Sequence, residues 1–410
     1  MSKSRSAQTM IYIGGFELPD GNAAAQRVRN NAGILRALGY RVVLLGVSRS
    51  RSYDRKVYPA DAGDSDVEAW ETGYPVSKSD WFDTIRADWP VRQLFGNGAL
   101  EATDISAIIC YNHPAIAQVK LAQLARDCGA LALADCTEWY AKRSWTSVAN
   151  IVKNVDVAAR MHWINQRMDG IITTSPYMSR HYGANGMPVV KIPTLIDHMS
   201  GSSAAALRES GPLPLFAVAS GFAERARAQD IHDRIDWILE LLNTVVDDVP
   251  PFVLRIAGVD RERYLSVFPD HAAIIARLGK RVDFLGRIPR SQLLEGLQEA
   301  AFAFVLRHES RVTLAGFPGK YSESVSFGTP VIINRIPSVE PYHIEARTGF
   351  LIDTDNPGKA AGALCRVLNR DRLEIAEMKR YCRESRIFSA ESFVGPFRAF
   401  LEKAAKRTDS

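Results

Sequence analysis

One stretch of the sequence, Ala315–Asn334, constrains the fold more than any other. Its first residues are rich in glycine and proline and predict a loop that brings backbone close to a ligand. Lys320–Phe327 then predicts a short helix ended by Gly328, and Pro330–Asn334 is an apolar run typical of a buried strand. A loop that opens into a helix presents free N–H groups and a positive dipole end, which suits a phosphate group.

Two charged side chains accompany this helix start. Lys320 lies in the first turn and can add a positive charge to a phosphate site. Glu323 follows three residues later and faces nearly the same side, where a carboxylate can accept two hydrogen bonds from a ribose diol. The alternative is an ordinary helix start with a favourable glutamate and a solvated lysine.

The same stretch resembles the donor-binding segment of retaining glycosyltransferases of family 4, which have the GT-B fold. Glu323 matches the second glutamate of their paired-glutamate signature, and residues 328–332 match the Gly-x-Pro-Val-Ile run that follows it. The F-P-x-K-x-x-E-S form of residues 317–324 is similar to a bacterial branch linked to surface polysaccharides. Ala315 stands where the family has its first glutamate, which contacts the transferred sugar, so the resemblance leaves the sugar open.

Strands and helices alternate along both halves of the chain, which predicts an α/β protein with two Rossmann-like domains. We expect domains over 1–200 and 201–390, with 391–410 as a last helix, and a linker over Ser200–Pro214. The polar stretch Ser48–Gly98 is expected to form loops and helices. The resemblance implies two domains facing each other across a cleft, with an acceptor-side first domain, a donor-binding second domain and a last helix that crosses back.

Polar residues at the carboxyl ends of parallel strands face the ligand crevice, so several such residues are site candidates. In the first domain these candidates are Asn112, His113, Asp135 and Glu138. Glu138 is expected to contact the donor sugar or an acceptor hydroxyl. His113 is either a catalytic residue or an ordinary loop residue before a proline.

The resemblance also implies an arginine and a lysine that neutralise the leaving nucleoside diphosphate. Arg225 or Arg227 matches the arginine loosely, and His232 stands where related sequences have the lysine. The predicted catalytic residues are Glu138, His113, Arg227 and Lys320. The predicted donor-binding residues are Gly14, Gly15, Gly221, Arg225, Arg307, Arg311, Gly316, Phe317, Pro318, Gly319, Glu323, Ser324 and Val325. Gly14 and Gly15 are alternatively simple turn residues, and each arginine is alternatively a solvated loop charge.

The amino-acid composition limits which cellular compartment and which binding partners are expected for this protein. The five cysteines show no CxxC pairing or metal-ligand spacing, which favours reduced thiols in a cytoplasmic protein. No apolar stretch reaches about 18 residues, so no spanning helix is expected. The net charge of +5 suits an anionic nucleotide or an anionic membrane and is weak support for nucleic acid. No metal and no cofactor are expected.

An aromatic and basic segment predicts peripheral contact with the inner face of the cytoplasmic membrane. Lys142–Arg167 carries five Lys or Arg residues against one Asp. Its aromatic neighbours are Trp139, Tyr140, Trp145 and Trp163, and a second group in the same domain is Trp81, Phe82, Trp89 and Phe95. Such side chains favour the headgroup level of a bilayer. The alternative is that the aromatic residues belong to the core and the basic ones to a solvated helix face.

The resemblance implies a retaining hexosyltransferase that uses a UDP- or GDP-linked sugar. Its acceptor would be a glycan or a lipid-linked molecule in bacterial polysaccharide or glycoconjugate synthesis. Two alternatives stay open. One is a sugar-nucleotide 2-epimerase or hydrolase of the same fold, and the other is a non-catalytic nucleotide-sugar-binding scaffold, which Ala315 keeps in consideration.

Overall fold

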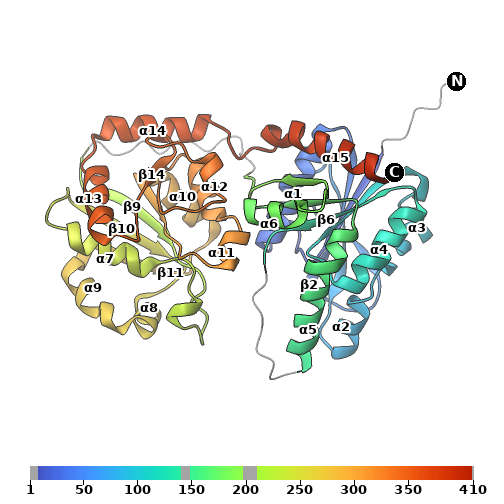
Figure 1. Cartoon of the computed structure of the whole chain (residues 1–410). Coiled ribbons are helices and arrows are strands. Elements are labelled where there is room, and N and C mark those ends of the chain that lie inside the picture. The colour runs from blue at the N-terminus through green and yellow to red at the C-terminus, as the bar shows by residue number, and fades with distance from the viewer. Residues whose placement is uncertain (1–7, 140–147, 197–209, 409–410) are drawn as a thin grey trace. The chain divides into compact units, whose positions relative to one another are not determined.

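The computed structural model describes residues 8–139, 148–196 and 210–408 (Figure 1). The chain divides into two compact units. Unit 1 comprises residues 1–197 together with 389–410, and unit 2 comprises residues 198–388. The predicted domain boundary after residue 200, and most of the predicted linker, lie outside the described residues.

Unit 1 contains an eight-stranded sheet with the order β3-β4-β2-β1-β5-β6-β7-β8. Every described pairing in it is parallel except the antiparallel pair of β3 and β4. Its strands are β1 (Thr9–Gly14), β2 (Arg41–Ser52), β3 (Val57–Ala60), β4 (Glu68–Tyr74), β5 (Ile105–Tyr111), β6 (Leu131–Cys136), β7 (Gly170–Thr173) and β8 (Val189–Lys191).

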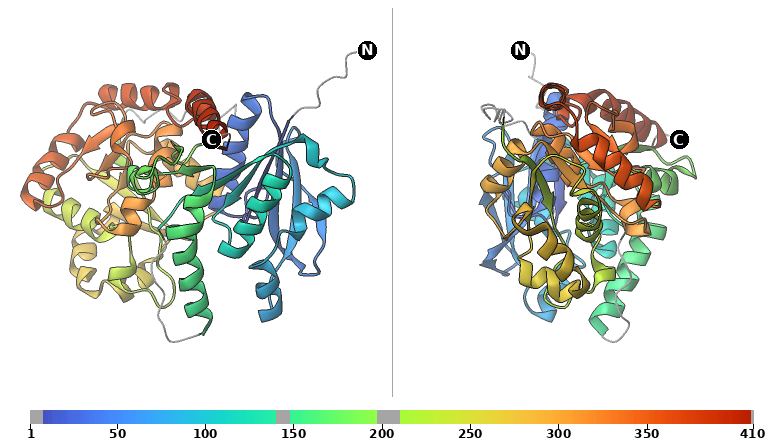
Figure 2. Two further views of the ribbon diagram at one scale, coloured as in Figure 1. Left: turned by 45° about the vertical axis from the view of Figure 1, so that its right-hand side comes forward. Right: turned by 90° about the vertical axis from the view of Figure 1, so that its left-hand side faces the viewer.

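Helices cover both faces of this sheet (Figure 2). They are α1 (Ala23–Ala37), α2 (Lys78–Thr84), α3 (Trp89–Gly96), α4 (Ala115–Asp127), α5 (Val148–Ala159), α6 (Pro176–Gly183) and α15 (Val394–Thr408). The last helix, α15, packs on β6, β7 and β8. Gly170 permits this approach, because a Cβ there would lie 2.6 Å from the ring of Phe400.

Two sequence-based expectations for irregular structure are wrong in part: helices α2 and α3 lie within Ser48–Gly98 as expected, but strands lie there as well. Within Ser48–Gly98, β2 continues to Ser52 and is followed by β3 and β4, which extend the sheet to its edge. These strands are short, and the residues at the end of β2 are exposed, so no clear apolar alternation marks them. The predicted linker also runs too far, since Leu213 and Pro214 already belong to β9. A proline is tolerated at the start of a strand because few ladder bonds are lost there.

Unit 2 contains a six-stranded parallel sheet with the order β11-β10-β9-β12-β13-β14. Its strands are β9 (Leu213–Val218), β10 (Phe252–Ala257), β11 (Val282–Gly286), β12 (Phe302–Val305), β13 (Val331–Ile333) and β14 (Gly349–Leu351). Its helices are α7 (Ile235–Val245), α8 (Arg261–Val267), α9 (Ala272–Leu278), α10 (Arg290–Glu299), α11 (Arg311–Ala315), α12 (Gly319–Ser326), α13 (Pro357–Leu368) and α14 (Arg372–Glu384).

The core of unit 2 lies on both sides of its sheet. Leu215 and Ala217 point into a cluster that includes α7 and α13, whereas Phe216 points into a second cluster with Leu297 of α10. Strands buried on both faces read as continuous apolar runs in the sequence. The alternation of strands and helices in the second half of the chain could therefore be predicted from the sequence.

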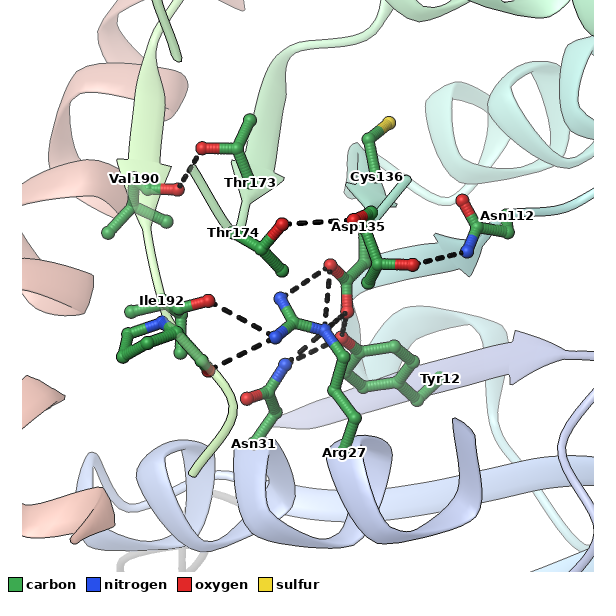
Figure 3. Close-up of polar contacts among 12 residues, drawn as sticks. Tyr12, Arg27, Asn31, Asn112, Asp135, Cys136, Thr173, Thr174, Val190 and Ile192 are labelled. Atoms are coloured by element: carbon green, nitrogen blue, oxygen red, sulfur yellow. Dashed lines mark hydrogen bonds and ion pairs between the residues drawn. The ribbon is translucent and has the colours of Figure 1, made fainter. Parts of the chain in front are cut away.

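A buried ion pair holds the middle of unit 1 together (Figure 3). Asp135, at the end of β6, is fully buried and accepts two close hydrogen bonds from Arg27 of α1, at 2.8 Å and 2.9 Å. Nη1 of Arg27 donates to the carbonyl oxygens of Ile192 and Pro193, just beyond β8. Tyr12 of β1 donates its hydroxyl to the same carboxylate. Asp135, expected at the ligand crevice, is instead enclosed in this network.

Because a buried charge left without its partner is expensive, Arg27→Met should lower the free energy of unfolding by about 3–5 kcal/mol. A matched control is Arg41→Met, since the Arg41–Glu68 pair is 36% and 44% exposed. That change should cost at most about 1 kcal/mol. Urea unfolding of both variants and the wild type measures the difference. Equal losses in the two variants would show that the buried network does not stabilise unit 1.

Candidate functional site

The loop, helix and strand predicted over Ala315–Asn334 are present in unit 2. The helix is α12, and the strand that follows is β13, adjacent to β12 in the sheet. Pro318 stands at the N-cap position, where no side chain caps the first turn. The helix therefore begins at the carboxyl edge of the parallel sheet, where ligands of open α/β sheets bind.

Lys320 lies in the first turn of α12, and protein groups engage its ammonium fully. Its Nζ donates to the carbonyl oxygen of Val218 at 2.7 Å, to Oγ of Ser220 at 3.2 Å and to the carboxylate of Asp233. Three acceptors satisfy the three N–H groups of an ammonium. Burial lowers the pKa of Lys320, and the charge of Asp233 opposes that shift. Lys320 thus ties α12 to the end of β9.

Asp233 is the buried carboxylate at the centre of this cluster, and it is not among the site residues predicted from the sequence. It accepts hydrogen bonds from Lys320 and Ser220 on one oxygen and from Nε of Arg307 on the other, at 3.2 Å. Burial alone would raise the pKa of Asp233, but the charges of Lys320 and Arg307 outweigh it and lower that pKa to about 2. Asp233 is therefore ionised throughout the physiological pH range.

Arg307 follows β12 and is held by its backbone as well as its side chain. Its N–H donates to Oδ1 of Asn334 at 2.9 Å, and its carbonyl oxygen accepts from Nδ2 of Asn334 at 2.7 Å. The two terminal Nη atoms have no hydrogen-bond partner among the described residues, and the side chain is 18% exposed. Arg307 consequently offers two donor atoms that no protein group occupies.

Glu323 lies one turn after Lys320 and is paired with a residue of another helix. Its Oε1 lies 2.9 Å from Nη1 of Arg290, the first residue of α10. A small void lies between α12 and strands β9 and β12. It is lined by Lys320, Glu323 and Ser324 on the helix and by Phe216 on β9. The side chain of Glu323 is only 16% exposed, and its ion pair with Arg290 orients the carboxylate.

The remaining donor-site candidates differ in what surrounds them. The exposed ones are Arg225, Arg227 and Arg311. Phe317 is in the core, where its ring packs against Tyr342 and Phe388. Ser324 donates its hydroxyl to the carbonyl oxygen of Lys320, and Val325 is buried in the same core as Phe317. Gly221 has a positive φ of 86°, which places it in the left-handed region that favours glycine.

In unit 1 the structure brings several predicted residues to one pocket of about 250 Å³. Gly14, Gly15, Asn112 and His113 line it. Its other walls carry four aromatic side chains, Tyr53, Tyr74, Trp81 and Trp89. Gly14 is needed here for packing, since a Cβ would lie 2.7 Å from the carbonyl oxygen of Tyr111. Aromatic faces with a few polar groups are typical of small-molecule sites.

His113 is buried in that pocket as a neutral side chain. Burial, and then the charge of Arg160, lower the pKa of His113 to about 4. Its Nε2 has no hydrogen-bond partner among the described residues. Arg160 donates to the carbonyl oxygen of His113 at 3.3 Å and so fixes this turn of the chain. Glu138 lies outside the pocket lining, exposed two residues beyond β6.

Two features are absent from the described part of the chain, 8–139, 148–196 and 210–408. None of its helices is long and apolar enough to cross a membrane. No three His, Cys, Asp or Glu side chains within those ranges are grouped as ligands for a metal ion.

Comparison with known proteins identifies the fold of the chain and a family match for part of its sequence. Residues 221–370 match the family described as glycosyl transferases group 1, a range that includes Asp233, Arg307, Lys320 and Glu323. No curated protein matches the chain by sequence.

Solved structures match along nearly the whole chain. Sucrose-phosphate synthase from Thermosynechococcus elongatus is 17% identical, with a TM-score of 0.63 over 97% of this chain and 98% of that one. HepE of Anabaena, in complex with UDP and glucose, is 15% identical, with a TM-score of 0.57 over 96% and 99%. An α,α-trehalose-phosphate synthase (UDP-forming) from Burkholderia vietnamiensis is 11% identical, with a TM-score of 0.61 over 97% and 100%. The α/β architecture of the chain is that of the GT-B fold, as predicted.

Proposed function

We propose that this chain, whose residues 221–370 match the group 1 glycosyl transferases and whose fold is GT-B, transfers a sugar from a nucleotide-sugar donor to an acceptor hydroxyl. The observation that carries the proposal is the cluster at the start of α12. There the carboxylate of Glu323, paired with Arg290, and a partly free Arg307 lie at the carboxyl edge of the unit 2 sheet. A carboxylate suits a ribose diol, and an arginine suits a diphosphate.

We further propose a hexose carried by UDP or GDP and transferred with retention. Support for UDP comes from HepE, whose structure contains UDP and glucose, and from the UDP-forming synthase of Burkholderia. Support for retention is the resemblance of residues 317–332 to a retaining family.

The chemistry requires little from a catalytic base. The bond between the anomeric carbon and the distal phosphate oxygen breaks, and the acceptor oxygen forms a bond to the same carbon. The electron pair of the broken bond leaves with the diphosphate, so negative charge accumulates on its oxygens, and the diphosphate can take the acceptor proton. Cations held in place before the reaction stabilise that charge without reorganising. We propose that the aromatic pocket of unit 1, lined by Gly15 and His113, receives the acceptor, a glycan or a lipid-linked molecule in a bacterial glycan pathway.

Turnover with a donor panel tests the function. The protein should release nucleoside diphosphate from one UDP- or GDP-sugar faster when a glycan or lipid-linked acceptor is present. Release at the same rate without any acceptor would favour a hydrolase, and a change of the sugar on an intact donor would favour a 2-epimerase. Saturable donor binding with no turnover would favour a scaffold. Coupled detection of free UDP or GDP, mass spectrometry of glycosylated products and NMR of the recovered donor, which identifies an epimer of equal mass, distinguish these outcomes.

Glu323→Ala should weaken binding of the nucleoside diphosphate by about 1.5–3 kcal/mol, the range for a hydrogen bond to a charged group. The same change should weaken the corresponding 2′,3′-dideoxy nucleotide much less, because that analogue lacks the diol. Isothermal titration of both ligands measures the effect. Equal losses for the two ligands would show that Glu323 does not hold the ribose.

Peripheral membrane contact is a second part of the proposal, and exposed apolar side chains in unit 1 support it. They gather on α2, α4 and α5, and they are Trp81, Phe82, Ile116, Val119, Ile151, Val152 and Val155. Two backbone N–H groups of α4 link these helices: that of Ala117 donates to the carbonyl oxygen of Ile85, and that of Ala115 to the carboxylate of Asp156. Lys78, Lys120 and Lys153 are exposed on the same helices.

Other aromatic residues of the predicted patch are differently placed. Trp163 is 61% exposed, but Trp139 packs against His162, Tyr177 and His181. Tyr140, Lys142, Arg143 and Trp145 lie outside the described residues. The support therefore comes from the α2, α4 and α5 face and from Trp163.

The double change Phe82→Ser and Val155→Ser should reduce co-sedimentation with anionic vesicles at low salt, because it removes two exposed apolar side chains from that face. Wild-type binding should fade as salt rises, since each Lys or Arg near the surface contributes about 1 kcal/mol. Leu373→Ser, at a residue of α14 in unit 2 that is 75% exposed, is the matched control. Absence of wild-type binding at low salt, or an equal loss in the control, would contradict membrane contact through this face.

A further inference from the structure

The cations of the unit 2 site are not equivalent, and one aspartate divides their roles. Asp233 binds Lys320 and Ser220 through one oxygen and Arg307 through the other. One carboxylate and two cations leave a net charge of +1 in this group. Where that charge is available depends on which N–H groups are still free.

Lys320 has no N–H group left for a ligand. Val218, Ser220 and Asp233 accept from its three donors, and two of these acceptors lie at or just beyond the end of β9. A phosphate oxygen could reach this ammonium only by displacing a protein acceptor. The displaced group would lose a charge-assisted hydrogen bond in a largely buried setting, which makes the exchange unfavourable.

Arg307 has the opposite arrangement. Its guanidinium uses Nε for Asp233, and its Nη atoms have no partner within the described residues. Its backbone forms an isolated antiparallel bridge with Asp233, and the neighbouring Arg234 N–H donates to the carbonyl oxygen of Leu306 at 2.8 Å. Asn334, at the end of β13, binds both the N–H and the carbonyl oxygen of Arg307.

We infer that Asp233, with Asn334, positions Arg307 as the side chain that contacts the leaving diphosphate, and that Lys320 is a tether between α12 and β9. The inference rests on the proposed function. A guanidinium held through Nε keeps the planar pair of Nη donors free, which matches two oxygens of a phosphate group. The ordering cost of a long side chain is met before the ligand arrives, which favours binding.

The assignment can be separated from a simple effect of charge. Asp233→Asn removes a negative charge beside the site, so charge alone predicts tighter binding of a diphosphate. Loss of the acceptor that aligns Arg307 predicts weaker binding. The informative quantity is the ratio of affinities for UDP over uridine, and for GDP over guanosine, because it isolates the contribution of the diphosphate.

Isothermal titration of the full chain with these four probes tests the assignment. Arg307→Gln should lower the ratio at least tenfold, with nucleoside affinity unchanged within about twofold. Asp233→Asn should also lower it, and Lys320→Met should lower thermal stability and reduce the ratio less than Arg307→Gln does. Arg335→Gln is the control, since it removes one charge beside Asn334 from a side chain that is 79% exposed.

Three results would overturn the assignment. They are an unchanged ratio in Arg307→Gln, a raised ratio in Asp233→Asn, and a larger fall in Lys320→Met than in Arg307→Gln. If Asp233→Asn does not fold, Arg307→Lys replaces it, because it keeps the charge but loses the planar fork, and its ratio should also fall. A wild-type protein that binds neither diphosphate more tightly than its nucleoside would overturn the proposed donor class as well.

Discussion

A buried aspartate at the carboxyl edge of the sheet organises each unit. In unit 1, Asp135 forms an ion pair with Arg27 of α1, and Arg27 in turn donates a hydrogen bond to the backbone beyond β8. In unit 2, Asp233 forms ion pairs with Lys320 of α12 and with Arg307, which follows β12. An ionised carboxylate can remain in the interior only when it is paired, so segments distant in the sequence must meet there. In unit 1 all three guanidinium nitrogens of Arg27 have protein partners, whereas in unit 2 the Nη atoms of Arg307 have none among the described residues.

Much of this architecture could be predicted from the order of apolar runs. In the unit 2 sheet β9, β12 and β13 are largely buried, and their continuous apolar sequences identify them without further information. The edge of the unit 1 sheet could not be found in this way. β3 has four residues, pairs antiparallel with β4 and is incompletely buried, so tertiary pairing rather than local pattern makes it a strand.

The candidate site shows the same division between local and long-range information. The start of α12, with Lys320 and Glu323 on one short helix, could be predicted because glycine, proline and helix signals lie within a few residues. The residues that pair with these two side chains could not be predicted from the sequence. Asp233 is 87 residues from Lys320 in the sequence, and the two side chains meet only when the chain folds. Asn334 carried a weaker signal, as a polar residue closing an apolar strand at the ligand edge of a parallel sheet.

The protonation states of the two units agree with a division of chemical work between them. His113, with its pKa lowered to about 4, is neutral at physiological pH, so under the proposed function it would orient an acceptor hydroxyl without donating a proton to the sugar. Asp233 stays ionised, so the two cations that it holds keep their places at the same pH. If a departing diphosphate takes the acceptor proton, neither unit needs a strong base. What the protein then supplies is a fixed cation at the carboxyl edge of the unit 2 sheet and, in unit 1, a pocket with largely aromatic walls.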